Sequence, residues 1–136
     1  MKVDSTDKQI LHILSNNSRI KLTDLAQRIH LSAPATKARL LNLEDHDVIQ
    51  RYTIDINHTN LGYKVHVFLH FSLHQPRMLT FNKIINEWQE NMIRCCRSSG
   101  ETDFIYEARF KSQDQLYRFI NQVSKVAAYR VYAILK

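Results

Sequence analysis

The sequence predicts an α+β protein with a three-helix N-terminal domain of the helix-turn-helix type, a linking strand and a C-terminal ferredoxin-like βαββαβ domain. Apolar residues recur at helical spacing through residues 5–44. They alternate with polar residues over residues 51–56, which is the period of a half-buried strand. The second half repeats strand and helix patterns in the order β-α-β-β-α-β. We expect the helical domain over residues 1–50, the linking strand and hinge over 51–61 and the ferredoxin-like domain over 62–136.

Two short helices joined by a tight turn are expected between residues 22 and 44. Ser32 can accept an N–H group in the first turn of the second helix, where Pro34 is tolerated because that turn does not need its N–H. Asp4 can cap an earlier helix that packs across the pair and completes a three-helix unit. The buried side of the second helix is expected to contain Thr36, Leu40 and Leu43, spaced four and three residues apart.

The other side of that second helix carries small side chains, one cation and no acid. Such a surface fits a DNA major groove about 12 Å wide without steric or charge conflict. Lys37 is expected to contact a base edge or a phosphate. Arg39 either lies near the DNA backbone or pairs with Glu44 or Asp45 inside the domain. An ordinary helical hairpin with a small exposed face is the alternative. The expected DNA-facing positions are Ser32, Ala33, Ala35, Lys37, Ala38, Arg39 and Leu41.

The distribution of charge supports a nucleic-acid partner more than the total does. The chain carries 19 Lys and Arg against 13 Asp and Glu, a formal net charge of +6. From Arg19 to Arg39 there are five basic residues against Asp24 alone, a local net charge of +4. A local patch matters more than a total for attracting phosphate groups. Arg19, Lys21 and Arg28 are therefore expected to position the phosphate backbone of double-stranded DNA rather than to read its bases.

The sequence indicates neither a membrane segment nor a catalytic centre. No apolar run reaches the roughly 18 residues of a transmembrane helix, and the N-terminus lacks the apolar region of a signal peptide. We therefore expect a soluble, cytoplasmic protein. There is no nucleophile–base arrangement, and the two glycines of the chain form no phosphate-binding loop. We expect no enzyme activity and no cofactor.

The histidines and cysteines do not form a metal site by their spacing. His66, His70 and His74 recur at even spacing, and three histidines could bind zinc. Residues i and i+4 of a strand lie about 13 Å apart, too far for one ion, so satisfied or interfacial histidines are expected. The adjacent Cys95 and Cys96 point to opposite faces of a strand and cannot easily share a metal. We expect them to be buried structural thiols.

Several short stretches are informative as a set. They are VDSTDKQIL near the N-terminus, LAQRIHLS, the pairs Arg39-Leu40 and Leu43-Glu44, Val48-Ile49 with Tyr52, Leu61-Gly62, and Gly100 with Asp103. Together they run through nearly the whole chain and resemble the Lrp/AsnC, or feast/famine, family of prokaryotic transcription regulators. The chain departs from the family pattern where Asp47 replaces a glycine and Thr36 an aliphatic residue. Lys21 replaces a capping residue, so Thr23 is expected to cap the following helix late.

The resemblance implies a sequence-specific DNA-binding transcription regulator that forms dimers, and further tetramers or octamers, and responds to an amino acid bound between dimers. Backbone N–H groups near Gly100 can receive a carboxylate, and Asp103 can receive an ammonium group. The alternative is a simple hairpin turn in which Asp103 accepts local amides. Glu101 adds negative charge, so we expect a neutral or basic amino acid. The expected effector-binding residues are Ser99, Gly100, Glu101, Thr102 and Asp103.

The third strand of the ferredoxin-like domain carries Phe104, Tyr106 and Phe110. RNA-recognition domains of the same topology stack bases on aromatic residues there, but ETDFIYEARF lacks their K/R-G-F/Y-G/A-F core. We expect this aromatic face to bury against a second copy of the chain, because two helices cover only one face of a sheet. An RNA-binding or metabolite-binding ferredoxin-like module without DNA readout is the alternative.

Overall fold

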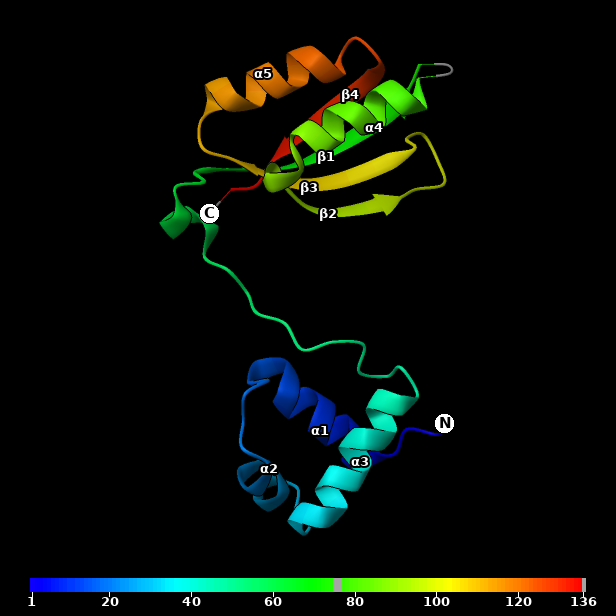
Figure 1. Ribbon diagram of the computed structural model, residues 1–136, viewed down its shortest axis with the longest axis vertical. Coiled ribbons are helices and arrows are strands. Elements are labelled where there is room, and N and C mark those ends of the chain that lie inside the picture. The colour runs from blue at the N-terminus through cyan, green and yellow to red at the C-terminus, as the bar shows by residue number, and fades with distance from the viewer. Residues whose placement is uncertain (75–76, 136) are drawn as a thin grey trace. The chain divides into compact units, whose positions relative to one another are not determined.

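The computed structural model describes residues 1–74 and 77–135 and divides into two compact units, Met1–Asp55 and Ile56–Lys136 (Figure 1). The predicted α+β class is confirmed, with helices in the first unit and a four-stranded antiparallel sheet with helices in the second. The division falls inside residues 51–61, which the sequence predicts as linker. Residue 136, the expected end of the second domain, lies outside the described residues.

The first unit consists of three helices, α1 (Ser5–Asn16), α2 (Leu22–Arg28) and α3 (Ala33–Asp45). The predicted cap of α1 is present in full. The Asp4 carboxylate accepts the Asp7 N–H at 2.8 Å, and the Asp7 carboxylate accepts the Asp4 N–H at 3.1 Å. This reciprocal pair satisfies two of the N–H groups that a helix leaves free at its start.

The other two helices begin differently from each other. Ser32 caps α3 as predicted, and its hydroxyl accepts the Ala35 N–H at 3.3 Å. α2 begins at Leu22, directly after Lys21, whose side chain makes no capping hydrogen bond. The expected late cap by Thr23 is therefore wrong. A helix as short as α2 depends on tertiary packing for its stability.

Apolar packing holds the three helices together. Thr36 and Leu43 point inward from α3 as predicted, each with 0% of its surface exposed, and Leu40 is half-buried against the same core. The Thr36 hydroxyl donates to the Ser32 carbonyl at 2.9 Å, so this buried polar group is satisfied. The buried core contains Ile10, Leu25, Ile29 and Leu43.

Asp47 makes the turn after α3 with a backbone conformation that favours glycine. Its φ is 55°, in the left-handed region that Asp and Asn tolerate better than other side chains. The family resembled by the sequence has glycine at this position. Asp47 therefore preserves the local turn despite the departure from the family pattern.

The predicted linking strand is not formed, and residues 51–57 have no regular secondary structure. A strand needs a neighbour to pair its N–H and C=O groups, and the sheet of the described residues contains only strands of the second unit. The Tyr52 hydroxyl donates to Glu44 Oε1 at 2.7 Å, whereas Ile54 is 72% exposed. Burial, together with Glu44, raises the pKa of Tyr52 to about 12. The segment is thus irregular chain fastened to α3 at Tyr52.

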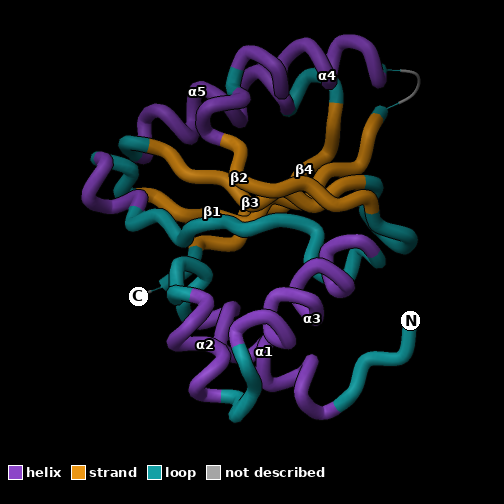
Figure 2. The backbone as a smooth tube through the Cα atoms, turned by 60° about the horizontal axis from the view of Figure 1, so that its bottom comes forward, coloured by secondary structure: helices purple, strands orange, loops and turns teal. Residues whose placement is uncertain are grey.

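The second unit has the predicted βαββαβ order, with its strands arranged β2-β3-β1-β4 and every neighbouring pair antiparallel. Both helices lie on one face of the sheet (Figure 2). Its elements are the 3-10 turn η1 (His58–Leu61), β1 (Val65–Leu73), α4 (Met78–Glu87), the 3-10 turn η2 (Gln89–Asn91), β2 (Met92–Arg97), β3 (Phe104–Phe110), α5 (Gln113–Val123) and β4 (Ala127–Ala133).

The aromatic side chains of β3 face α4 and α5, so the expectation that they bury against a second copy of the chain is wrong. Phe104 pairs with Phe71 across the β1–β3 ladder, and the Phe71 ring lies 5.4 Å from the ring of Phe81 on α4. Phe104 is 9% exposed, Tyr106 8% and Phe110 0%. Strand periodicity shows that these residues share a side, but it does not show which side the helices cover.

Cys95 and Cys96 are exposed, which corrects the expectation of buried thiols. They lie on β2, an edge strand that pairs with β3 alone. Cys95 is the register partner of Tyr106. Burial of the Tyr106 hydroxyl, with the neighbouring Cys95, raises the pKa of that hydroxyl.

Substituting two leucines of α3 tests which side of this helix faces the core. Leu43→Ala should destabilise the first unit by about 2–5 kcal/mol, because it opens a cavity in the core. Leu41→Ala on the same helix should change stability by less than about 0.5 kcal/mol, because Leu41 is 47% exposed. The measurement is urea unfolding followed by far-UV circular dichroism, since the single tryptophan, Trp88, lies in the second unit. Equal losses for both variants would contradict this packing.

Candidate nucleic-acid interface

The side of α3 opposite its buried residues faces solvent and carries mostly small side chains. Lys37 makes no ion pair with any described residue, and its neighbours on this side are mostly alanines. Of the predicted positions, Ser32, Ala35, Lys37, Ala38 and Leu41 are exposed and Ala33 is half-buried. This side of α3 is thus narrow enough for a DNA major groove and offers one unpaired ammonium group to a polyanion.

Arg39 does not belong to this exposed surface. Its Nη1 lies 2.8 Å from Asp4 Oδ2 and 2.8 Å from Asp7 Oδ1, so it joins α3 to the start of α1. Asp7 is 3% exposed, and a buried carboxylate needs such a partner. The structure therefore favours the intradomain alternative for Arg39, with these two aspartates in place of Glu44 or Asp45. The Asp7 N–H, and then Arg39, lower the pKa of Asp4 from its ordinary value of 3.8.

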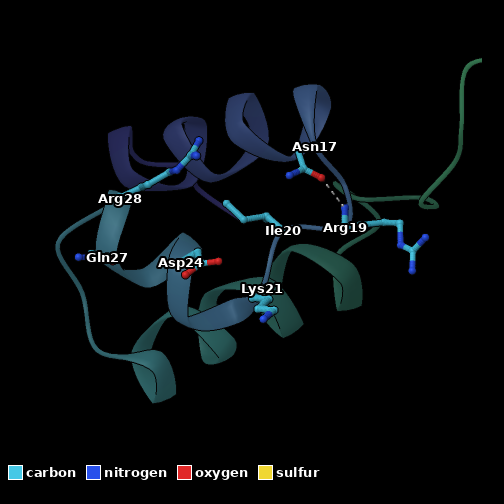
Figure 3. Close-up of a pocket in the computed structure, with 7 residues that line it drawn as sticks. All are labelled: Asn17, Arg19, Ile20, Lys21, Asp24, Gln27 and Arg28. Carbon is cyan, nitrogen blue, oxygen red and sulfur yellow. Dashed lines mark hydrogen bonds between the residues drawn. The ribbon is translucent and has the colours of Figure 1, made fainter.

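The three predicted phosphate positioners line a single hollow of about 520 Å³ between the end of α1 and α2. Figure 3 shows Arg19, Lys21 and Arg28 spread around this hollow, with Asp24 as the one acid among its lining residues. The Arg19 N–H donates to Asn17 Oδ1 at 3.1 Å, which orders the connection between the two helices. No ion pair joins Asp24 to these cations within the described chain. Separated cations suit a run of backbone phosphates better than a single anion.

The turn between β2 and β3 is tied to the end of β1. The Asp103 N–H donates to the Phe71 carbonyl at 2.8 Å, and Asp103 Oδ2 accepts the Leu73 N–H at 2.8 Å. The Ser72 hydroxyl donates to the Glu101 carbonyl at 2.9 Å. One Asp103 oxygen therefore has the local role that the sequence left as the alternative to ligand binding.

A small hollow of about 160 Å³ adjoins this turn. Glu101 and Thr102 line it, whereas the predicted effector residues Ser99, Gly100 and Asp103 do not. Gly100 has φ 153°, and a Cβ built there would meet no atom within 4 Å, so a larger residue is disfavoured by backbone strain rather than by lack of space. The other lining residues are His70, Ser72, Ala128, Tyr129 and Arg130.

The even-spaced histidines have separate surroundings. His66 Nε2 lies 2.8 Å from Glu107 Oε1, and the His70 ring lies 4.9 Å from that of Tyr132. Among the residues that the structure describes, no three His, Cys, Asp or Glu side chains are grouped to hold a metal ion. Nor does the described part of the chain contain a helix long and apolar enough to span a membrane.

Comparison with known proteins assigns both units to one family. The AsnC-type helix-turn-helix domain matches residues 3–44, and the Lrp/AsnC ligand binding domain matches residues 66–136. The HTH-type transcriptional regulator LrpA of Bacillus subtilis is 32% identical over 133 residues, covering 98% of each chain. This chain belongs to the Lrp/AsnC family. It is a helix-turn-helix transcription regulator with a ligand-binding domain, and not an enzyme.

Two solved structures share the fold of this chain. Bacillus subtilis LrpC has a TM-score of 0.90 and 26% identity, and the match covers 100% of this chain and 96% of LrpC. A Neisseria meningitidis transcriptional regulator in complex with L-methionine has a TM-score of 0.87 at 23% identity, covering 99% of this chain and 91% of its own. The resemblance stated from the sequence is confirmed.

Sequence reasoning missed some residues of these sites. The sequence predicts Asp4 as a helix cap, but nothing in its spacing connects Asp4 or Asp7 to Arg39, more than 30 residues away. Tyr129 and Arg130 lie in the last strand of the predicted βαββαβ order, and the sequence gives them no further role. The β1–β4 pairing brings this strand beside His70 and hence to the turn.

The role of Arg39 can be tested against that of Lys37 on the same helix. At pH 7 Arg39→Met should destabilise the first unit, since it leaves the buried Asp7 carboxylate uncompensated, whereas Lys37→Met should not. Because the pKa of Asp4 is lowered on folding, its contribution is complete above the unfolded value of 3.8 and is lost as the pH falls through the lower folded value. The difference between wild type and Arg39→Met should therefore shrink below pH 3.8. Urea unfolding across pH measures this, and a pH-independent difference would exclude the ion pairs as its cause.

Proposed function

We propose that this protein is a sequence-specific DNA-binding regulator that acts in the cytoplasm as an oligomer and responds to an amino acid. The observation that carries the proposal is the exposed side of α3, where Lys37 stands unpaired among small side chains opposite the buried Thr36 and Leu43. A helix of this kind can enter a major groove, with Lys37 at a base edge or a phosphate. The hollow lined by Arg19, Lys21 and Arg28 supports contact with the adjacent backbone.

The rival RNA-binding function has less support. A ferredoxin-like domain that stacks RNA bases needs aromatic side chains exposed on the open side of its sheet. Phe104, Tyr106 and Phe110 are buried beneath the helices instead. A metabolite-binding module without DNA readout would leave the cationic surface of the first unit without a role.

DNA binding is tested by removing the cation from the proposed interface. Lys37→Ala should weaken binding to a specific DNA site by about 5- to 150-fold per copy, the equivalent of about 1–3 kcal/mol. Lys8→Ala is the matched control, because Lys8 is an exposed lysine on α1 outside the basic window. Electrophoretic mobility shift with a genomic fragment selected for binding gives both affinities. Unchanged affinity for a folded Lys37→Ala protein would remove α3 from the interface.

Self-association is proposed through the face of the sheet that the helices leave open. Phe68 and Tyr132 are register partners on β1 and β4, and Ile105 of β3 is on the same side by strand alternation. Tyr132 is 46% exposed. An apolar and aromatic surface of this kind favours burial against a second copy of the chain. A dimer would also place two α3 helices on DNA half-sites, which recur about every 34 Å in dimeric helix-turn-helix proteins.

Two exposed tyrosines on opposite sides of the second unit provide the test. Tyr132→Glu should shift the protein toward monomer, because it introduces a charge into the proposed interface. Tyr117→Glu on α5 should not, since Tyr117 is 62% exposed on the helical side. Sedimentation velocity at micromolar concentration measures the assembly state. A stable wild-type monomer, or equal effects of the two substitutions, would contradict the proposed interface.

The effector site is proposed at the turn between β2 and β3. Asp103 Oδ2 accepts the Leu73 N–H, but its other oxygen accepts no hydrogen bond from the described residues and suits an ammonium group. The Neisseria meningitidis regulator of the same fold was solved with L-methionine, which supports an amino-acid ligand. Glu101 beside the hollow favours a neutral or basic amino acid over an acidic one.

Asp103→Asn separates ligand binding from structure, because the amide oxygen can still accept the Leu73 N–H while the charge is lost. Binding of a neutral amino acid should weaken by about 10-fold or more, as expected for a lost hydrogen bond between charged groups. Asp114→Asn, an exposed aspartate of α5, is the control. Calorimetry with a panel of amino acids measures both. Equal binding by wild type and Asp103→Asn would place the effector elsewhere.

A further inference from the structure

The second unit contains another hollow, of about 660 Å³, at the end of the sheet away from the turn. It opens between residues 56–60 and the ends of β1, β3 and β4. His66 lines this hollow, and His70 is the nearest β1 residue that lines the one beside the turn. These positions are four residues apart along the strand, a distance of about 13 Å. The two hollows are therefore different sites.

Strand pairing concentrates basic side chains here. His66 and Arg109 are register partners in the β1–β3 ladder, so their side chains leave the sheet on the same face. Lys64 precedes β1 and lines the same hollow. The Ile134 N–H donates to the His66 carbonyl at 2.9 Å, which brings the end of β4 alongside. His58 contributes a further imidazole from η1.

The charge of this hollow is not compensated within the described residues. No carboxylate is among its lining residues. Glu107, the acid next to it, lies 2.8 Å from His66 Nε2 and is thereby engaged. Neither Lys64 nor Arg109 makes an ion pair with a described residue. Arg109 Nε is in addition buried without a hydrogen-bond partner among those residues, an arrangement that an acceptor from outside would relieve.

We propose that this hollow binds a small organic oxyanion, a phosphate or carboxylate carried by a metabolite, between Arg109 and Lys64. A guanidinium offers two parallel N–H donors to such a group, and an ammonium adds a second point charge. The hollow is larger than an inorganic anion requires, and Ile56 and Ile134 at its wall, 47% and 40% exposed, offer apolar contact to an organic portion. The site does not depend on DNA binding or on the turn that we propose for amino acids.

Calorimetry on the full chain in chloride buffer tests the proposal, with inorganic phosphate and 3-phosphoglycerate as probes. Wild type should bind 3-phosphoglycerate more tightly than phosphate, and Arg109→Gln should lower its affinity at least 10-fold. Lys64→Gln should also lower the affinity for 3-phosphoglycerate. Because Lys64 is exposed, this variant is expected to fold and keeps the test valid even if Arg109→Gln does not fold. Arg118→Gln and Lys125→Gln, exposed on and after α5, are the matched controls and should bind as wild type does.

Two results would overturn the proposal. One is no binding of either probe by wild type, or equal binding by wild type and both hollow variants. The other concerns the source of the phosphate: if the variants lose DNA affinity in a mobility shift while wild type binds neither probe, the hollow receives DNA phosphates and not a metabolite. Loss of probe binding with unchanged DNA affinity supports the small-anion site.

Discussion

The contact of Arg39 with Asp4 and Asp7 is the interaction on which the orientation of α3, and with it the proposed DNA interface, depends. It fastens one side of α3 to the start of α1 at 2.8 Å to each carboxylate, while Thr36 and Leu43 bury the adjacent side. With two sides committed, the small residues and Lys37 are left facing solvent. The ion pairs also neutralise Arg39 within the unit, so four of the five basic residues from Arg19 to Arg39 remain without an ion pair to a described residue. Arg39 therefore acts by orienting α3 against α1.

In the second unit the governing constraint is that two helices cover one face of a four-stranded sheet. The covered face takes the large aromatic side chains, and the open face is left with Phe68, Ile105 and Tyr132 between two chemically different ends. The turn end offers carboxylates at Glu101 and Asp103, whereas the opposite end gathers Lys64 and Arg109. A centre suited to a second copy, an end suited to a zwitterion and an end suited to an anion can thus coexist on one sheet.

The sequence predicts local structure well, but it predicts poorly which side chains distant in the sequence come into contact. Capping by Asp4 and Ser32, the buried stripe of α3 and the order of strands and helices along the chain all follow from spacing within a few residues. The prediction of a linking strand was wrong. Apolar residues such as Tyr52 and Ile54 alternate with polar ones as in a strand, but no neighbouring strand is there to pair with them. Whether Phe104 is buried depends on which face of the sheet the helices cover. The exposure of Cys95 depends on which strand lies at the edge of the sheet. For the same reason the partners of Arg39, and the position of Lys64 and Arg109 around one hollow, are visible only in the fold.

The central claim is that DNA is held by the exposed side of α3 together with the cations around the hollow between α1 and α2. The salt dependence of DNA affinity tests it most directly, because each phosphate contact contributes about 0.9 to the slope of log K against log salt concentration. In the double variant Arg19→Ala, Lys21→Ala the slope should be smaller than that of wild type by about 1.8 per copy bound. The pair Lys83→Ala, Lys125→Ala in the second unit should leave it unchanged. Identical slopes for wild type and the first double variant would contradict the account.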